Sequence, residues 1–264
     1  MLLNKYLVLQ KIVMVLNEDK VSLQIDCIVQ ARMSSTRLPG KVLLNIDESH
    51  RIIDFLIDQL NQTRINRLII AIPDSKENDV LENYLKKLNI ICFRGNELDL
   101  LDRYYQCAKK FSLKHIMRLT GDNPLIDPEI VNLAIEEYHT AKCDYLTNSV
   151  DRTFPYGTEV EVFSFNSLEN AWRNAMNRSE REHVTPYFYN NPNKFNIKHL
   201  TQSVDYSKFR YTVDQEEDFL LVKQIVKKIK SRPIITKDII EILNDNPDIQ
   251  KINSKVKPKS LEQD

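Results

Sequence analysis

One short segment combines cations and hydroxyl groups in a pattern suited to binding phosphate. Residues 31–41 read Ala-Arg-Met-Ser-Ser-Thr-Arg-Leu-Pro-Gly-Lys, directly after the apolar run at residues 25–30. No acidic residue occurs from Cys27 to Ile46. Loop amides and the hydroxyls of Ser34, Ser35 and Thr36 can surround phosphate oxygens, while Arg32, Arg37 and Lys41 neutralise them. Taken alone, the charges also fit a solvated basic loop.

Two aspartates stand at the ends of later apolar runs. Asp122 lies in Gly-Asp-Asn-Pro at 121–124, and Asp214 lies in Tyr-Thr-Val-Asp-Gln-Glu-Glu-Asp at 211–218. Magnesium is usually held by one or two carboxylates together with substrate phosphates. The alternatives are an ordinary turn at Asp122 and a helix N-cap at Asp214. Together with the cationic loop, the two aspartates indicate metal-assisted displacement at phosphorus, which is nucleotidyl transfer.

Alternating strands and helices must position these loops. Apolar runs at 25–30, 67–72, 90–94, 115–119 and 144–147 alternate with helical spacing at 52–60, 80–88, 98–108 and 128–139, the last N-capped by Asp127. This order predicts right-handed crossovers and a mainly parallel sheet, with ligands beyond the carboxyl ends of the strands. Further on, we expect strands at 158–164 and 209–213, helices at 168–176, 182–189 and 216–230, and a frayed polar tail after Asn244.

Composition excludes several classes of protein. The chain has only four glycines in 264 residues, and their positions fit neither a G-x-G-x-x-G dinucleotide loop nor a Walker A loop. Lys plus Arg and Asp plus Glu both number 37, which argues against nucleic acid as a partner. No apolar run approaches the roughly 18 residues needed for membrane insertion. The scattered cysteines Cys27, Cys92, Cys107 and Cys143 indicate reduced thiols and a cytoplasmic location.

The loop at 31–41 resembles the signature of the acidic-sugar cytidylyltransferases, which make CMP-3-deoxy-manno-octulosonate and CMP-sialate. Segments 121–124 and 213–218 match that family's two metal-aspartate motifs, in order. Within the family, the chain is most similar to the spore-coat polysaccharide branch, which shares segments 99–105, 159–163 and 180–187. The resemblance covers about residues 25 to 230.

The resemblance implies a fold and an organisation of the chain. We expect a three-layer α/β nucleotide-diphospho-sugar transferase fold, Rossmann-like, with a mainly parallel sheet and a smaller β-containing subregion for dimerisation and substrate binding. The expected parts are a catalytic domain at 25–245, a polar tail at 246–264 and an N-terminal extension at 1–24. That extension is an extra helix, a partner-binding arm or sequence upstream of a start at Met14. The expected homodimer would pair through residues 153–165 and Trp172.

The resemblance also implies roles for single residues. The catalytic groups would be Arg32, Lys41 and Asp122, with Asp122 and Asp214 holding Mg²⁺. The nucleotide would contact Ala31, Arg32, Ser35, Arg37, Lys41, Arg94, Asp102, Arg103 and Gly121. The acceptor would contact Tyr156, Glu159, Arg181 and His183, although His183 also fits a solvated helix. Thr120 replaces a glutamine of the octulosonate enzymes, and Gln215-Glu216 replaces the usual Thr-Pro after the second aspartate. These differences leave the identity of the acceptor sugar open.

The expected reaction is attack by an acidic sugar's anomeric hydroxyl on the α-phosphorus of CTP, with pyrophosphate as leaving group. Two alternatives remain: transfer from another nucleotide or to a non-sugar or sugar-phosphate acceptor, and a non-catalytic nucleotide-binding member of a glycan assembly complex. Core packing is expected for at least one of Tyr104 and Tyr105, and a structural role is expected for His115. Trp172 is expected in the core or at a dimer surface.

Overall fold

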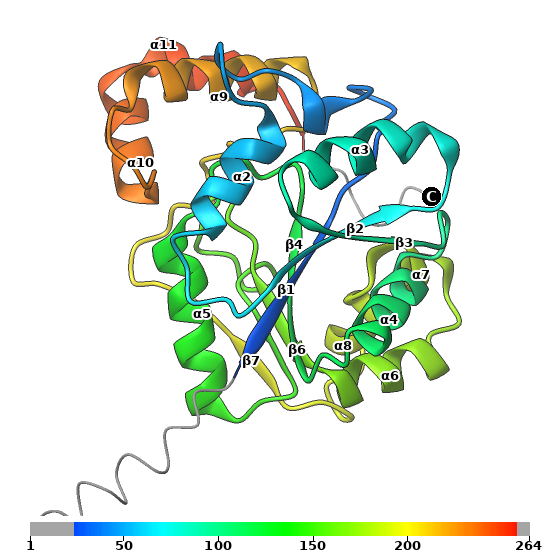
Figure 1. Cartoon of the computed structure of the whole chain (residues 1–264). Coiled ribbons are helices and arrows are strands. Elements are labelled where there is room, and N and C mark those ends of the chain that lie inside the picture. Colours follow the sequence, from blue (N-terminus) through cyan, green and yellow to red (C-terminus); the bar gives the residue numbers. More distant parts are fainter. Residues whose placement is uncertain (1–23, 258–264) are drawn as a thin grey trace, which may run out of the picture.

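Seven strands form a single sheet in the computed structural model of the chain, which describes residues 24 to 257. The spatial order is β3-β2-β1-β4-β6-β5-β7 (Figure 1). The strands are β1 (Ile25–Gln30), β2 (Leu68–Pro73), β3 (Ile91–Gly95), β4 (His115–Thr120), β5 (Tyr145–Thr147), β6 (Glu161–Ser164) and β7 (Ile197–His199). Strand β6 runs antiparallel to both of its neighbours, and the other pairs are parallel. The predicted mainly parallel sheet is therefore confirmed.

The register of β1 and β4 brings two of the predicted loops together. Gln30 at the end of β1 pairs with Thr120 at the end of β4. Because parallel strands present their carboxyl ends at one edge, the segments that begin at Ala31 and Gly121 leave the sheet side by side.

Helices cover both faces of the sheet and form the outer two layers. Cys27 and Val29 of β1 pack with α2, α3 and α5, whereas Ile28 packs with α4, α6 and α8, as alternation along a strand requires. In Figure 1, α5 and the group α4, α6 and α8 lie to opposite sides of the sheet. The bounds are α2 (Ile52–Leu60), α3 (Asp79–Lys87), α4 (Leu100–Lys110), α5 (Pro128–Ala141), α6 (Phe165–Asn174), α7 (Arg178–His183) and α8 (Pro186–Tyr189).

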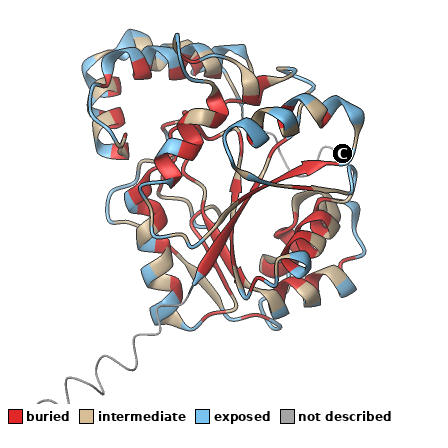
Figure 2. Cartoon of the chain, in the orientation of Figure 1, coloured by how far each residue is buried: buried red, intermediate tan, exposed pale blue. Residues whose placement is uncertain are grey.

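A third apolar cluster joins the C-terminal helices to α2. The elements are α9 (Glu216–Lys228), α10 (Thr236–Asp245) and α11 (Pro247–Gln250), with short 3₁₀ turns η1 (Lys41–Leu43), η2 (Lys76–Asn78) and η3 (Lys251–Asn253). Ile52 and Phe55 of α2 pack against Leu221 of α9 and Ile239 of α10. Figure 2 shows burial concentrated in the sheet and on the inward faces of the helices. The C-terminal helices therefore form part of the same folded body.

Two predicted elements are wrong for identifiable reasons. Residues 209–213 do not join the sheet and form only a bridge between Tyr156 and Arg210. Their apolar alternation arises because Phe209, Tyr211 and Val213 pack in the cluster of α9 and α10. The helix expected at 182–189 is instead split into α7 and α8. Val184, between them, has φ 70°, a positive value that interrupts the right-handed helix, and α8 restarts with Pro186 in its first turn.

The polar tail also departs from expectation. Residues 246–253, expected to fray, form α11 and η3, and Asn253 is buried. The N-cap at Asp127 is confirmed, because its side chain accepts from the amide of Glu129. Apart from its last residue, the expected extension at 1–24 lies outside the described residues. Within residues 24–257, no helix is long and apolar enough to cross a membrane.

Candidate active site

The cationic loop at 31–40 folds back on itself and ends by placing Lys41. The amide of Gly40 donates to the carbonyl of Met33 over 2.9 Å, and Gly40 has φ 68°, a left-handed conformation that glycine adopts without strain. Lys41 then begins the 3₁₀ turn η1. Ser35 Oγ accepts from the amide of Leu38 over 3.4 Å and helps to close the loop. The result is a closed loop with one lysine directed away from it.

Asn78 fixes the same loop from a distant part of the chain, and sequence analysis did not find it. Its Oδ1 accepts from the amide of Met33 over 3.0 Å, and its Nδ2 donates to Ser75 Oγ over 2.9 Å. The residue is completely buried. The partners Asn78 and Met33 lie 45 positions apart, and no local pattern marks such a contact.

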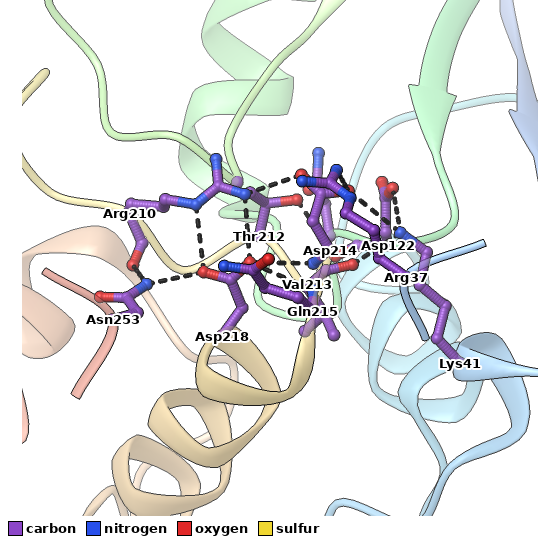
Figure 3. A network of polar contacts seen from close by, with 12 residues as sticks. Arg37, Lys41, Asp122, Arg210, Thr212, Val213, Asp214, Gln215, Asp218 and Asn253 are labelled. Carbon is purple, nitrogen blue, oxygen red and sulfur yellow. Dashed lines mark hydrogen bonds and ion pairs between the residues drawn. The ribbon is translucent and has the colours of Figure 1, made fainter. Parts of the chain in front are cut away.

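Lys41 brings the three predicted motifs together. Its Nζ donates to Asp122 Oδ2 over 2.8 Å, to Asp214 Oδ1 over 3.2 Å and to the carbonyl of Val213 over 2.7 Å (Figure 3). The residue is only 9% exposed, so its charge depends on these acceptors. The predicted proximity of Lys41, Asp122 and Asp214 is thus present in the structure.

Backbone contacts hold the Asp122 segment against the first strand and the Asp214 segment against the Asp122 segment. The amide of Gly121 donates to the carbonyl of Gln30 over 2.8 Å. A Cβ atom at Gly121 would lie 3.0 Å from both the Cβ of Ala31 and the carbonyl oxygen of Gln30, so glycine permits this approach. The amide of Val213 donates to the carbonyl of Asp122 over 2.8 Å. Asp122 and Asp214 are therefore positioned by main-chain bonds as well as by Lys41.

Three cations surround the carboxylate of Asp214. Besides Lys41, Arg37 lies 3.2 Å from its Oδ1, and Arg210 donates to its Oδ2 over 2.7 Å. Burial alone would raise the pKa of Asp214, but Lys41, Arg210 and Arg37 lower it below the usual aspartate value. Burial alone would lower the pKa of Lys41, but Asp122 and Asp214 raise it above the usual lysine value. At neutral pH these groups are therefore charged.

The two carboxylates suit a hard divalent cation that is completed by its substrate. Both reach the same ammonium, and their side chains are 25% and 23% exposed. Among residues 24–257, no hydrogen bond reaches Asp122 Oδ1, which leaves an oxygen donor for a ligand. The described residues contain no group of three or more His, Cys, Asp or Glu that could hold a metal alone. Asp122 and Asp214 therefore fit a Mg²⁺ ion that shares phosphate oxygens.

The other residues of the predicted phosphate loop differ in exposure. Arg32 is exposed at the surface, and the side chain of Arg37 is 38% exposed. Ala31 is buried, and its amide donates to the carbonyl of Ala71 over 3.1 Å, which continues the sheet contact beyond β1. Arg32 and Arg37 are therefore accessible to an anion, whereas Ala31 contributes backbone position.

The residues predicted further along the nucleotide pocket make contacts of their own. Arg94 binds the carboxylates of Asp79 and Glu82 over 2.7 and 2.8 Å. Arg103 is buried and donates to the carbonyls of Asn96 and Glu97, and burial lowers its pKa to about 10. Arg94 therefore joins β3 to α3, and Arg103 stabilises the segment between β3 and α4. Contact of either side chain with nucleotide stays a prediction.

Asp102, Trp172 and Arg181 connect α4, α6 and α7. Asp102 Oδ1 accepts from the indole Nε1 of Trp172 over 2.8 Å, and that ring stacks on Tyr105 with centroids 4.0 Å apart. Arg181 pairs with Asp99 and donates to the carbonyl of Trp172 over 2.7 Å. His183 ends α7. Trp172 is half-buried and packs within the chain, and β6 lies inside the sheet. Pairing of two copies through residues 153–165 and Trp172 stays a prediction.

The predicted acceptor residues Tyr156 and Glu159 lie next to the Asp122 segment. Glu159 accepts from Asn123 Nδ2 over 3.1 Å, from the amide of Gly157 over 3.0 Å and from Arg152 over 2.7 Å. The guanidinium of Arg152 lies 3.9 Å above the ring of Tyr156. Among the described residues, Asn123 Oδ1 is buried and has no hydrogen-bond partner, so it can accept from a ligand. Sequence analysis treated Asn123 only as part of a turn.

A buried polar network lies beneath the site, across strands β1, β4, β5 and β6. Gln30 Oε1 accepts from Tyr104 and from Arg118, over 3.2 Å in each case. Arg118 also pairs with Glu161, which accepts from the hydroxyl of Tyr145. Core packing was predicted for at least one of Tyr104 and Tyr105, and both are buried. His115 contacts the hydroxyl of Tyr138 over 3.2 Å, which fits its predicted structural role.

Comparison with known proteins finds relatives along most of the chain. The cytidylyltransferase family profile matches residues 27–251. The spore coat polysaccharide biosynthesis protein SpsF of Bacillus subtilis is 34% identical over 232 residues, covering 84% of this chain and 94% of that protein. An uncharacterized protein of Methanocaldococcus jannaschii is 37% identical over 237 residues, covering 88% and 96%. A cytidylyltransferase structure from Leptospira borgpetersenii superposes with TM-score 0.82 at 32% identity, covering 90% of this chain and all of that one.

Proposed function

The chain belongs to the cytidylyltransferase family of nucleotidyltransferases, and we propose that it couples CTP to an acidic sugar in a Mg²⁺-dependent reaction. The products would be a CMP-sugar, used for surface polysaccharide biosynthesis, and pyrophosphate. The observation that carries the proposal is the placement of Lys41 Nζ between Asp122 and Asp214, next to the cationic loop at 31–40. The acidic sugar is supported by the resemblance of segments 31–41, 121–124 and 213–218 to enzymes that use such acceptors.

Within this proposal, the chain acts by position and charge. Lys41, Arg32 and Arg37 hold the triphosphate and oppose the negative charge that grows on the leaving pyrophosphate. Asp122 and Asp214 would hold a metal ion, which would supply further positive charge at the phosphates. The acceptor oxygen forms a bond to the α-phosphorus as the bond from that phosphorus to the pyrophosphate oxygen breaks, and the proton of the acceptor hydroxyl passes to water. Orientation of the two substrates therefore supplies much of the rate.

The acceptor would lie beside the Asp122 segment. Asn123 Oδ1 is the buried acceptor atom available there, and it suits a sugar hydroxyl. Glu159 and Arg152 order the loop that carries Tyr156, so these residues would shape the pocket around the sugar. Following the family, we also propose a homodimer, which light scattering on the wild-type protein tests directly.

The test of the reaction is pyrophosphate release from each of the four NTPs with a panel of acidic and neutral sugars and sugar phosphates. Wild type is compared with Asp122→Asn and with the control Asp248→Asn, whose side chain is 98% exposed. We expect release with CTP and an acidic sugar, loss in Asp122→Asn and wild-type rates in the control. Absence of release with every pairing, or unchanged release in Asp122→Asn, contradicts the proposal.

The same panel separates the alternatives. Release with another nucleotide, or only with a sugar phosphate or non-sugar acceptor, identifies a different transferase that uses the same site. CTP binding measured by calorimetry, without turnover of any pairing, identifies a non-catalytic member of the family.

A further inference from the structure

Asp218 is a buried carboxylate that the proposed reaction does not use directly. It is 0% exposed in the first turn of α9. Its Oδ2 accepts from the backbone amides of Asp214 and Gln215 over 3.1 and 3.4 Å. A buried charge is costly unless it is paired and hydrogen-bonded, so the partners of Asp218 determine where it lies. Through these two amides, Asp218 also fixes the main chain at Asp214.

Arg210 pairs with Asp218 and extends the contact to the side chain of Asp214. Its Nε lies 3.1 Å from Asp218 Oδ1, and its Nη2 lies 3.1 Å from Asp218 Oδ2. The same Nη2 donates to Asp214 Oδ2 over 2.7 Å. The guanidinium is planar, so binding Asp218 with one edge fixes the direction in which it meets Asp214. Figure 3 shows Arg210 between Asp218 and Asp214.

Asn253 completes this arrangement from the C-terminal segment. Its Nδ2 donates to Asp218 Oδ1 over 2.8 Å and to the backbone carbonyl of Arg210 over 3.1 Å. The residue is 7% exposed and lies in η3, which packs against α9. One amide group therefore holds both members of the Arg210–Asp218 pair, 43 and 35 positions away along the chain.

We propose that Asn253, Arg210 and Asp218 are positioning residues that hold the carboxylate of Asp214 beside Lys41. The inference rests on the proposed function, in which Asp214 holds the metal ion. The backbone amide of Asp214 then donates to Asp218, and its carboxylate accepts from Arg210. Asn253 fixes the position of Arg210 relative to Asp218. The segment at 247–253 therefore supports the active site. This role explains why Asn253 is buried, whereas its neighbours in the tail are exposed or half-buried.

The test compares Asn253→Ala and Asn253→Asp with the control Asn246→Ala. Asn246 directly precedes the segment at 247–253 and donates to the carbonyl of Ile242 over 2.8 Å, and no hydrogen bond joins it to Asp218 among the described residues. Binding of Mn²⁺ is followed by the electron paramagnetic resonance signal of the free ion at a fixed CTP concentration, with and without protein, because CTP alone also binds Mn²⁺. The measurement requires no acceptor sugar. The Mg²⁺ concentration for half-maximal activity and the KM for CTP are measured in parallel, and thermal unfolding reports folding.

Loss of a hydrogen bond to a charged group predicts about tenfold weaker Mn²⁺ binding in Asn253→Ala. Asn253→Asp keeps the size of the side chain but brings a second carboxylate to Asp218, so its affinity for Mn²⁺ should fall by at least the same factor. We expect the Mg²⁺ requirement to rise in both variants by a larger factor than the KM for CTP. Asn246→Ala should bind Mn²⁺ as wild type does.

Two failures are distinguishable. If wild type with CTP binds no Mn²⁺, the metal role of the proposed function is wrong and the inference falls with it. If wild type binds Mn²⁺ and a folded Asn253 variant binds it equally well, only the positioning role is wrong. Should Asn253→Ala fail to fold, Asn253→Asp is judged by the same criterion. Equal weakening in Asn246→Ala would also overturn the inference, because it assigns the effect to general loosening of the segment.

Discussion

The ammonium of Lys41 lies 2.8 Å from Oδ2 of Asp122, although 81 positions separate the two residues. Lys41 follows the loop after β1, and Asp122 follows β4, the strand beside it. The contact therefore exists because two parallel strands end at the same edge of the sheet. It joins the proposed phosphate-binding loop to the first proposed metal ligand.

Replacing Lys41 by methionine should lower kcat/KM for CTP-dependent pyrophosphate release by about 100-fold or more, the usual effect of removing one preorganised group that opposes developing charge. The side chain is nearly isosteric, so its packing is kept while its charge is lost. Lys251→Met is the matched control, because the side chain of Lys251 is 72% exposed and pairs with the exposed side chain of Asp248. Steady-state kinetics at saturating acceptor measure both variants. A tenfold or smaller loss in Lys41→Met would contradict the assigned role.

The ion pairs of Lys41 and Asp214 should stabilise the fold across a wide pH range. The pKa of Lys41 is raised above its usual 10.5, so its contribution is complete below that value and is lost as pH rises through the folded-state pKa. The pKa of Asp214 is lowered below its usual 3.8, so its contribution is present above that value and is lost as pH falls through the folded-state pKa.

Urea unfolding of wild type and Lys41→Met measures this pH dependence. The difference in unfolding free energy should be flat from about pH 5 to pH 9 and should shrink toward both extremes. A difference that changes between pH 6 and pH 8 would show that another group controls the interaction.

Alanine at Gly157 should cost more stability than alanine at Gly40. Gly157 has φ 109°, and an added Cβ would lie 2.8 Å from the amide nitrogen of Thr212 and 2.9 Å from the ring of Tyr211. Gly40 has φ 68°, and its Cβ would meet only the flexible end of Met33 at 3.3 Å. We expect losses of about 3 kcal/mol and about 1 kcal/mol respectively, measured by urea unfolding. Equal losses would contradict the tight approach at Gly157.

The buried pair of Arg118 and Glu161 should be sensitive to loss of either partner. Their side chains are 13% and 5% exposed, so Glu161→Ala leaves an unpaired buried cation and should cost about 3–5 kcal/mol. The exposed pair of Arg64 and Glu136, with side chains 55% and 60% exposed, provides the comparison, and Glu136→Ala should cost less than about 1 kcal/mol. Chemical denaturation measures both, and similar costs would show that the buried network is not what stabilises the centre of the sheet.

Much of the fold could be predicted from local pattern. The apolar run at 25–30 coincides with β1, and Asp127 followed by Pro128 marks the start of α5, because strand burial and helix capping depend on neighbouring residues. The strand expected at 209–213 is wrong because the same local pattern, apolar alternation, arises there from packing against helices and not from pairing in a sheet. Its alternation is real, but only the tertiary structure decides that Tyr211 faces α9 and α10 and not a sheet neighbour.

Residue types and their order along the chain were enough to identify the candidate reactive groups: a cationic loop and two aspartates, each placed after an apolar run. The groups that hold them in place became evident only from the folded structure. Asn78 and Asn253 are ordinary polar residues in the sequence, and they acquire a role because buried groups must find partners wherever the chain folds back. Type and spacing reveal reactive groups near strand ends, whereas hydrogen-bond partners across 35 or more positions depend on packing.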